Sequence, residues 1–399
     1  MRGALLAAAG AGVLVSLSMV HWWQAVATFL DTSTYNFSAY DFRSFYAAGR
    51  LVVDGRAHDL YRHGAIAATA RTGGEPYFNP PFFALLWAPF SLVPFDAAYR
   101  AWTLISLCLL GLNGWLLWRL AAPIGRPWRA LLVAGFATWA PVSHGLVLGQ
   151  YSLLLSASWG GAYLLMRNGR DRLAGLALVP LLIKPEMLIP LTLYFVWKRQ
   201  HGVLATFAPA TVACVVLSIA IVGPAAAIDY PLYLIRESQF QRTDAMFGWM
   251  GVISRMFSSG DHRLATLAAT ALAAGTLALA ALGLRGPVDA RAEGFARCLL
   301  IVTIATVLSD LHLYVQDIAI LAAPAVAYLA ATSGRHRALA GTIIAAAWVI
   351  TWFTPFMSRG APVNIVFGVF LLIVMACLTA ASRKHACAQA TTSAIAEAA

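Results

Sequence analysis

Charged residues are scarce in this chain of 399 residues: Asp, Glu, Lys and Arg together make up 11% of it. Soluble globular domains carry about 25% charged residues, so this deficit excludes an ordinary soluble domain. Hydrophobic residues make up 60% of the chain, and the mean hydropathy is +0.72. This composition is typical of an integral membrane protein.

Cysteine is also rare, and the five cysteines lie far apart in the sequence. Their spacing fits neither a disulfide framework nor a zinc site, and most of them fall in apolar runs as small hydrophobic residues. The sequence also has no internal repeat of fixed period. Many transporters are built from such repeats, so their absence disfavours a transporter.

Long apolar runs are abundant, by contrast, and a helical membrane crossing needs about 20 residues of this kind. The runs cover residues 4–23, 101–118, 130–148, 151–166, 202–223, 263–283, 298–311, 314–332, 338–355 and 363–381. They predict an all-α polytopic integral membrane protein with about 10–12 transmembrane helices. We expect one transmembrane domain over 1–385, followed by a disordered cytoplasmic tail at 386–399.

The positive net charge of +11 follows a topological pattern. Lys and Arg cluster in short segments between alternate apolar runs, such as 119–129, 167–172 and 285–297. Cytoplasmic loops carry an excess of these residues, so the pattern predicts that these segments and both termini are cytoplasmic. No nucleic-acid partner is needed to explain the charge. We expect a monomer in the inner (plasma) membrane, in contact with the lipid bilayer.

This topology requires residues 173–197 to enter and leave the membrane on the same side. Lys184 and Pro185 lie at the centre of this segment, and proline breaks a helix because it lacks an N–H donor and clashes with the preceding turn. Two half-length helices would then form a re-entrant pair. Broken backbone at membrane depth is tolerated where it is buried in protein or lines a wet cavity. One long tilted helix is the alternative.

Two long segments, 31–95 and 224–262, are predicted to lie on the outer side of the membrane. The first contains two amphipathic stretches, 40–53 and 56–70, which we expect to form juxtamembrane helices. The apolar, proline-rich stretch after them is expected to lie against the membrane surface or to dip into it. A loop of this length with its own helices usually has a function.

Charged side chains inside a membrane are costly, and they therefore mark candidate sites. Lys184 and Glu186 lie at the predicted helix break, and Asp310, His312 and Asp317 lie in the stretch SDLHLYVQD. These five residues come from two distant parts of the sequence.

The predicted topology places Lys184, His312 and Gln150 in the outer half of the membrane. The first outer loop carries Asp41 on that same side, among aromatic residues and arginines. This convergence indicates a functional site at the outer face.

Each candidate also has a purely structural interpretation. Asp41 could cap a juxtamembrane helix, because Asp is a favoured N-cap residue. Lys184 could extend toward the interface or neutralise Glu186, and His312 could be a hydrogen-bonded residue at a helix end. Asp317 could pair with a nearby arginine.

Five stretches, taken in order, resemble the glycosyltransferase 87 family. They are YDFRSFYAAGRLVVDGRAHDLY, YFNPPFFALLWAPFSLVP, GQYSLLL, RDRLAGLALVPLLIKPEMLIPL and SDLHLYVQDIAIL. The family comprises polyprenol-phosphate-mannose-dependent mannosyltransferases of the GT-C class, and the resemblance covers residues 35–330. It implies a GT-C fold and a polyprenyl-phosphate-sugar donor, most often of mannose. It also implies transfer to a lipid- or glycan-linked acceptor at the outer face of the membrane.

The resemblance implies roles for individual residues as well. The acid of the first loop is taken as the catalytic base in this family, and Asp41 occupies the matching position. Lys184 and His312 match positions expected to hold the donor phosphate. Arg43 and Arg50 are further candidates for contact with the phosphate, or for keeping Asp41 ionised, since a nearby opposite charge favours the ionised form.

Other polar and aromatic side chains are expected to contact the substrates: Tyr46, Tyr77, Asn79, Gln150, Glu186, Asp310 and Asp317. The sequence departs from the family at Glu186, where a small residue usually follows Lys-Pro, and an acid there weakens anion binding at Lys184. It also has no Asp-x-Asp in the first loop, unlike metal-using GT-C relatives. We therefore expect no metal and no cofactor.

Glycosyl phosphates already carry a good leaving group. The enzyme must therefore deprotonate the acceptor hydroxyl and stabilise an oxocarbenium-like state. One carboxylate opposite the leaving phosphate suffices for inversion, so the resemblance implies an inverting hexosyltransferase with Asp41 as general base. A transporter or flippase of a lipid-linked sugar, and a GT-C transferase with a protein or lipid A acceptor, are the alternatives.

Overall fold

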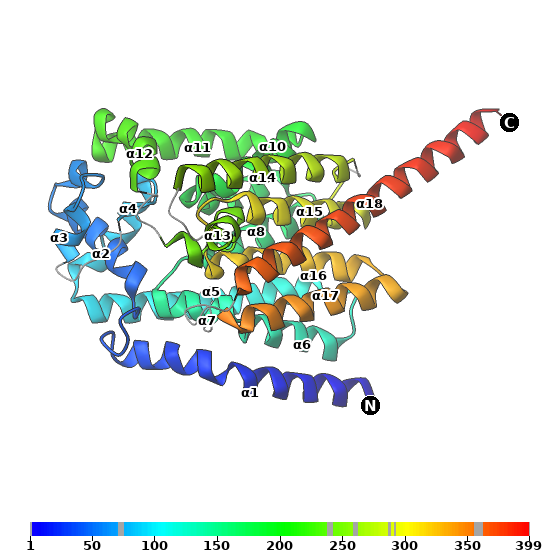
Figure 1. The fold of residues 1–399 in the computed structure, drawn as a ribbon, viewed down its shortest axis with the longest axis horizontal. Helices are drawn as coiled ribbons and strands as arrows, with labels where there is room; N and C mark the ends of the chain where they lie inside the picture. Colours follow the sequence, from blue (N-terminus) through cyan, green and yellow to red (C-terminus); the bar gives the residue numbers. More distant parts are fainter. Residues whose placement is uncertain are drawn as a thin grey trace.

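The computed structural model describes residues 2–70, 76–237, 242–257, 262–285, 289–290, 293–354 and 362–398. Within these residues the secondary structure is entirely helical, as the sequence predicted (Figure 1). Six of the described helices are long and apolar enough to cross a membrane: Leu5–Leu30, Phe95–Leu120, Arg126–Leu148, His201–Val222, Arg263–Gly283 and Val363–Ser382. Two shorter apolar helices cover Gly294–Ser309 and Val315–Ala331. The polytopic membrane fold is confirmed, and the total of 10–12 crossings stays a prediction.

The helices of the main body lie side by side in a bundle (Figure 1). They are α1 (Arg2–Leu30), α5 (Phe95–Leu120), α6 (Arg126–Ala137), α7 (Ala140–Leu148), α8 (Ser152–Arg167), α11 (His201–Val222), α14 (His262–Gly283), α15 (Glu293–Ser309), α16 (Ala322–Ala331), α17 (Gly334–Trp352) and α18 (Val363–Ala398). Both termini lie at the right-hand end of the bundle in Figure 1, and the short helices of the first loop lie at the opposite end.

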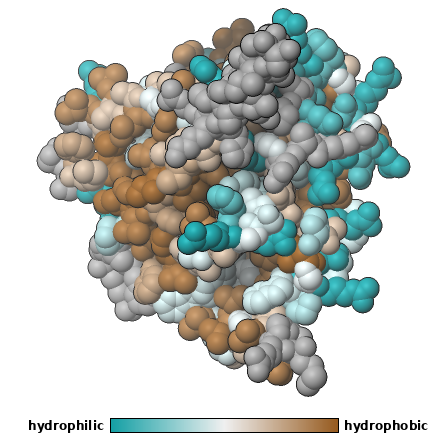
Figure 2. All heavy atoms as spheres, turned by 90° about the vertical axis from the view of Figure 1, so that its right-hand side faces the viewer, coloured by the Kyte–Doolittle hydropathy of each residue, from teal (hydrophilic) through white to brown (hydrophobic). Residues whose placement is uncertain are grey.

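The basic clusters share the end of the bundle that carries the termini. Arg119 and Arg126 flank the turn between α5 and α6, and Arg335 lies in the first turn of α17, just after α16. Both connections lie at the right in Figure 1. Figure 2 views this end directly, and hydrophilic side chains gather over one part of it beside a hydrophobic region. The clustering of basic residues at one end agrees with the charge pattern of the sequence.

The first loop folds into short helices. α2 (Tyr40–Val53) has the bounds predicted for the first amphipathic stretch, whereas the second stretch divides into the 3-10 turn η1 (Ala57–Asp59) and α3 (Ala65–Ala70). α4 (Pro81–Trp87) and the 3-10 turn η2 (Phe90–Leu92) follow.

The proline-rich stretch packs into the protein through α4. The ring of Trp87 stacks on that of Phe45 of α2, with centroids 4.8 Å apart, and both side chains are buried. A Cβ atom on Gly49 would lie 2.4 Å from the carbonyl carbon of Trp87. Only glycine therefore allows α2 and α4 to approach this closely.

The helix break predicted at Lys184 is present. α9 (Asp171–Ala177) leads into the 3-10 turn η3 (Val179–Ile183), and α10 (Pro185–Trp197) begins directly after Lys184. The two ends of this segment meet, because a Cβ atom on Gly202 would lie 2.7 Å from Cβ of Asp171. Residues 171–202 therefore form a hairpin of two half-length pieces, and the alternative of one long tilted helix is wrong.

Two other predicted spans are also interrupted. The span at 130–148 divides into α6 and α7, with Pro141 in the first turn of α7, and proline is well accommodated there because the first N–H groups have no helical partner. The span at 314–332 divides into the 3-10 turn η6 (Val315–Leu321) and α16.

The remaining elements lie in the second loop and at the C-terminus. The second loop contains α12 (Pro224–Glu237), the 3-10 turn η5 (Thr243–Ala245) and α13 (Trp249–Met256). α18 continues through residues 386–398, for which the sequence predicted a disordered tail. Alanine is abundant there and has the highest helix propensity, which favours extension of the helix.

Candidate active site

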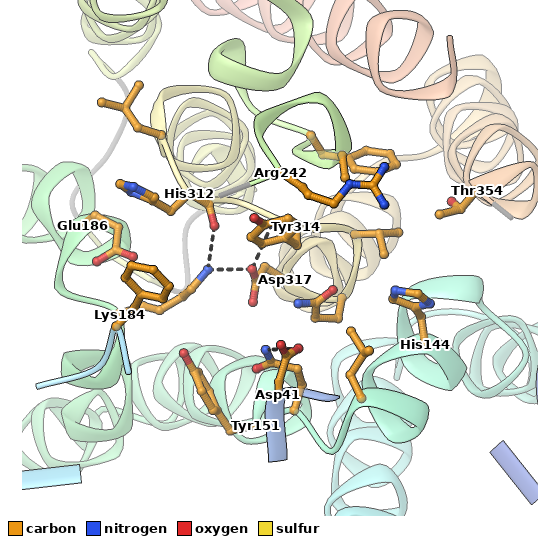
Figure 3. A pocket seen from close by; sticks show the side chains of 18 of the residues that line it. Asp41, His144, Tyr151, Lys184, Glu186, Arg242, His312, Tyr314, Asp317 and Thr354 are labelled. Atoms are coloured by element: carbon orange, nitrogen blue, oxygen red, sulfur yellow. Dashed lines mark hydrogen bonds and ion pairs between the residues drawn. The ribbon is translucent and has the colours of Figure 1, made fainter. Parts of the chain in front are cut away.

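A cavity of about 1340 Å³ lies where the first loop, the helix break and the second loop meet (Figure 3). Its walls come from α1, α2, α7, α10, α13, α14 and the segment between α15 and η6. Sites for a single small ligand measure about 300–1,000 Å³. The cavity therefore has room for two substrates at once.

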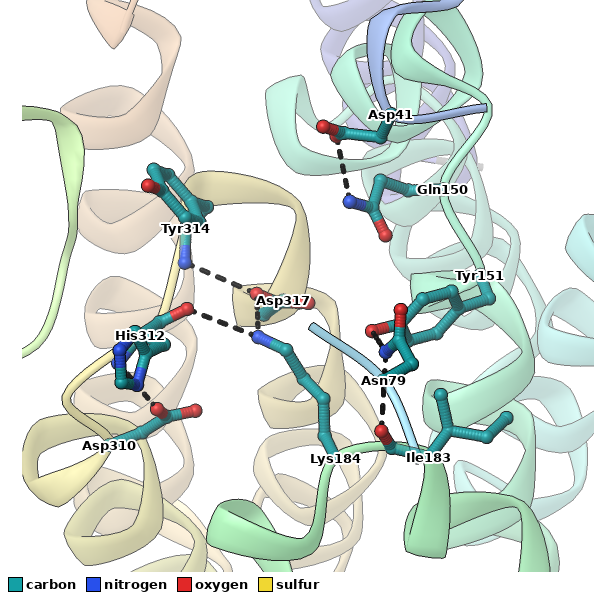
Figure 4. A network of polar contacts seen from close by, with 10 residues as sticks. All are labelled: Asp41, Asn79, Gln150, Tyr151, Ile183, Lys184, Asp310, His312, Tyr314 and Asp317. Carbon is teal, nitrogen blue, oxygen red and sulfur yellow. Dashed lines mark hydrogen bonds and ion pairs between the residues drawn. The ribbon is translucent and has the colours of Figure 1, made fainter. Parts of the chain in front are cut away.

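Asp41 lines this cavity from the first turn of α2. Its Oδ2 atom accepts a hydrogen bond of 2.7 Å from Nε2 of Gln150, which also lines the cavity. The N-cap position of α2 is occupied by Ala39, with φ of 52° and no side-chain cap. Asp41 is therefore not the N-cap of this helix, and its carboxylate faces the cavity (Figure 4).

The start of α2 is anchored on the end of α7. The amide of Ala39 donates a 2.8 Å hydrogen bond to the carbonyl of Val147. Gly149 ends α7 with φ of +73°, and a Cβ atom there would lie 2.6 Å from Cβ of Phe42, the neighbour of Asp41. Glycine is required at this position both for its backbone conformation and for the close approach.

Lys184 pairs with Asp317 on the other side of the cavity (Figure 4). Its Nζ atom lies 2.6 Å from Oδ2 of Asp317 and 3.2 Å from the carbonyl oxygen of His312. The same Oδ2 accepts a 3.1 Å hydrogen bond from the amide of Tyr314, the N-cap residue of η6. Both paired side chains are buried. The helix break is thus joined to the segment before η6 by an ion pair.

The partners of Lys184 and Asp317 differ from those proposed on the sequence. Lys184 pairs with an acid 133 residues away rather than with Glu186, and Asp317 pairs with a lysine rather than an arginine. Glu186 and His312 both line the cavity beside the pair (Figure 3).

Asp310 lies behind this wall and not among the residues that line the cavity. Its Oδ1 atom accepts a 2.8 Å hydrogen bond from the amide of His312. Its Oδ2 atom is buried and has no hydrogen-bond partner within the described part of the chain. Asp310 therefore shapes the His312 turn from behind.

Asn79 connects the first loop to the helix break. Its Nδ2 atom lies 2.6 Å from the hydroxyl of Tyr151 and 3.2 Å from the carbonyl of Ile183, the residue before Lys184. Asn79 and Tyr151 both line the cavity. The amide side chain thus positions the break relative to the first loop.

Besides Asp310, four more residues expected at the site do not line the cavity: Arg43, Arg50, Tyr46 and Tyr77. Arg50 forms an ion pair of 3.1 Å with Asp54, and Arg43 contacts the carbonyl of Ser38 at 3.4 Å. The reason is helical periodicity, because residues three or four apart share a face. The face of α2 that lines the cavity carries Asp41, Ser44 and Phe45.

The two tyrosines serve the packing of the first loop. The hydroxyl of Tyr46 donates a 2.8 Å hydrogen bond to the carbonyl of Val93. Tyr77 is fully buried, and burial raises its pKa well above the ordinary value. Its phenol therefore stays neutral at any ordinary pH. The geometry gives no support to sugar contacts by either ring.

Several residues that line the cavity were not singled out on the sequence. Arg242 and Asp244 of the second loop form an ion pair of 3.3 Å, and Arg255 of α13 contacts the carbonyl of Asp244 at 3.3 Å. His21 and His144 line another part of the cavity. Lone histidines inside apolar runs were the available signal for these two.

The described residues contain no group of three or more His, Cys, Asp or Glu side chains suited to hold a metal ion. The polar contacts of the site are instead hydrogen bonds and one buried ion pair.

Comparison with known proteins identifies the family. A family model described as glycosyltransferase family 87 matches residues 77–310. The polyprenol-phosphate-mannose-dependent alpha-(1-2)-phosphatidylinositol mannoside mannosyltransferase of Mycobacterium tuberculosis (strain ATCC 25618 / H37Rv) is 32% identical over 129 residues. That alignment covers 29% of this chain and 30% of the relative, so the chain matches less than a third of the relative's length. No solved structure matches.

The family match begins after Asp41 and ends at Asp310, so it includes Lys184 but not His312 or Asp317. It covers more than half of the chain and the whole helix break. The chain belongs to glycosyltransferase family 87, and it is a polytopic membrane protein.

Proposed function

We propose that this enzyme transfers a hexose, with mannose as the first candidate, from a polyprenyl phosphate to an acceptor hydroxyl with inversion at the anomeric carbon. The observation that carries the proposal is the position of Asp41. Its carboxylate faces the same cavity as Lys184 and His312, which come from the helix break and the segment before η6 (Figure 3). The proposed base and the proposed phosphate site lie on different walls of one cavity. This arrangement suits a displacement in which the anomeric carbon of the donor sugar is held between them.

In this mechanism the acceptor oxygen attacks the anomeric carbon and its proton passes to Asp41. The bond from that carbon to the phosphate oxygen breaks, and polyprenyl phosphate leaves with the electron pair. A general base contributes about 10²–10⁴-fold to such a step. Gln150 directs the carboxylate through its 2.7 Å hydrogen bond.

Lys184 would stabilise the charge that develops on the leaving phosphate. A lysine ammonium has three N–H donors, and two of them are directed to Asp317 and to the carbonyl of His312. The third has no partner among the residues that the structure describes, and we assign it to a phosphate oxygen. Arg242 of the second loop supplies a further guanidinium at the cavity wall. Fixed donors of this kind stabilise charge without reorganisation during the reaction.

We place the reaction at the outer face of the inner membrane. The basic clusters share the end of the bundle that carries both termini, and the positive-inside rule assigns that end to the cytoplasm. The first loop, with the α2 helix that carries Asp41, lies toward the opposite end. A lipid- or glycan-linked acceptor is expected there, and the name of the mycobacterial relative makes a mannoside lipid the first acceptor to test.

The proposal is tested with purified protein in lipid nanodiscs. The protein is incubated with labelled polyprenyl-phosphate-mannose and a membrane lipid extract, and free polyprenyl phosphate and labelled glycolipid are measured together. Appearance of both products in equal amounts is expected. Absence of donor cleavage with polyprenyl-phosphate-mannose and with its glucose counterpart would reject hexosyl transfer from this donor class.

A further inference from the structure

One end of the cavity lies on the side of Asp41 away from Lys184 and Glu186 (Figure 3). It is formed by α1, α7 and Thr354, which follows α17. We call it the α1–α7 lobe and define it by Val20, His21, Gln24, Ser143, His144 and Thr354. None of these residues has a part in the proposed transfer step.

Hydrogen bonds from tryptophans hold the walls of this lobe together. Nε1 of Trp352 donates to the carbonyl of Leu17 at 2.8 Å, which joins α17 to α1. Nε1 of Trp139 donates to Oγ1 of Thr351 at 2.6 Å, which joins the start of α7 to α17. The lobe is therefore a built feature of the fold, with three helices fixed around it.

Two histidines from different helices line the lobe. Nε2 of His21 is buried and has no hydrogen-bond partner within the described part of the chain. The ring of His144 makes no hydrogen bond to any described residue, and it lies at the cavity wall beside Thr354 (Figure 3). Buried polar atoms are paired in the great majority of cases, and ionisable residues at membrane depth are costly. Both observations point to a ligand.

The chemistry of the lobe selects the kind of ligand. A neutral imidazole offers one donor and one acceptor, and the amide of Gln24 and the hydroxyls of Ser143 and Thr354 also offer both. A sugar hydroxyl likewise donates and accepts. The six residues that define the lobe are uncharged, although the side chain of Arg242 reaches toward Thr354 from the second loop (Figure 3). The donors and acceptors of the lobe suit the hydroxyls of a polyol.

We propose that the α1–α7 lobe binds the sugar or polyol part of the acceptor and that His144 positions it, so that the reacting hydroxyl points to Asp41. This inference rests on the proposed function. His144 lies on α7, and the end of the same helix leads to Gln150, which holds the carboxylate of Asp41. One helix thus supports both the base and the acceptor. His144 is a positioning residue that contacts a hydroxyl next to the reacting one.

The test uses octyl α-mannoside as the acceptor probe and compares His144→Ala and His144→Gln with the wild type. His336→Ala is the matched control, because His336 is exposed on α17 and does not line the cavity. Loss of a hydrogen bond should weaken binding of labelled octyl α-mannoside about 3- to 10-fold in His144→Ala. His144→Gln should recover part of the affinity, and the control should bind as the wild type does. The KM for polyprenyl-phosphate-mannose should stay unchanged in all variants.

The inference is overturned if wild-type protein does not bind octyl α-mannoside, or if both His144 variants bind it like the wild type. It is also overturned if the KM for the donor rises in parallel, since that result would assign His144 to the donor site or to folding. Donor cleavage by the wild type is measured separately. If the wild type cleaves the donor but the His144 substitutions do not change mannoside binding, the proposal for the lobe is rejected and the transfer proposal stands. If mannoside binding depends on His144 but the wild type does not cleave the donor, the transfer proposal is rejected and the mannoside site stands.

Discussion

Nε2 of Gln150 donates a 2.7 Å hydrogen bond to Oδ2 of Asp41 and so links two residues that are 109 positions apart in the sequence. The bond connects the turn after α7 with the first turn of α2. It fixes one carboxylate oxygen, while the side chain still lines the cavity. A fixed geometry of this kind matters for proton transfer, because misplacement of a reacting group by about 1 Å can reduce the rate about 10²-fold.

Asp41→Asn should abolish most of the activity. Asparagine keeps the size of the side chain but cannot take the proton from the acceptor, so turnover should fall by about 10²–10⁴-fold. Release of labelled polyprenyl phosphate measures the effect. Asp54→Asn is the matched control, because Asp54 follows the same helix but pairs with Arg50 outside the cavity. Normal turnover in Asp41→Asn would reject Asp41 as the base.

Lys184 and Asp317 should show strong coupling in a double-mutant cycle. Removal of one partner from a buried ion pair leaves an uncompensated charge and costs about 3–5 kcal/mol of stability. Lys184→Met and Asp317→Leu should therefore each lower the melting temperature, and the double variant should recover much of the loss.

Activity should behave differently from stability in this cycle. The double variant lacks the ammonium that we assign to the leaving phosphate, so it should stay inactive although it folds. Melting temperature and donor cleavage are measured on the same preparations. A stable double variant with wild-type turnover would remove Lys184 from the donor site.

Gly149→Ala should reduce activity indirectly, by displacing the start of α2 and with it Asp41, without a change of the carboxylate itself. An alanine at φ of +73° is strained by about 1–2 kcal/mol, and its Cβ would lie 2.6 Å from Cβ of Phe42. Relief of this contact moves the start of α2, so turnover should fall together with stability. Gly111→Ala in α5 is the control, since a Cβ there meets nothing within 4 Å. Equal activity in the two variants would contradict this role for Gly149.

The orientation of the protein is tested by cysteine labelling from outside the cell. Asp54→Cys should react with a membrane-impermeant maleimide, because the first loop is proposed to lie on the outer side. Arg126→Cys should react only after the membrane is opened, since it belongs to a basic cluster. Both positions are exposed in the structure. The reverse pattern of labelling would invert the topology and place Asp41 on the cytoplasmic side.

The sequence by itself determined the features that depend on local chemistry. Its hydropathy was enough for an all-helical membrane fold, and the Lys184–Pro185 pair was enough to locate the helix break, because proline cannot continue a helix on its N-terminal side. The bounds of α2 followed from its amphipathic pattern. The sequence also led us to expect Asp41, Gln150, Lys184 and His312 in one region, and all four line the cavity.

Tertiary structure alone decided which groups meet. The pairing of Lys184 with Asp317 spans 133 residues, and nothing local distinguishes Asp317 from Glu186 as the partner. The exclusion of Arg43 and Arg50 from the cavity depends on which face of α2 packs on α7. That choice is made by the close approach at Gly149, a contact between segments that lie far apart in the sequence.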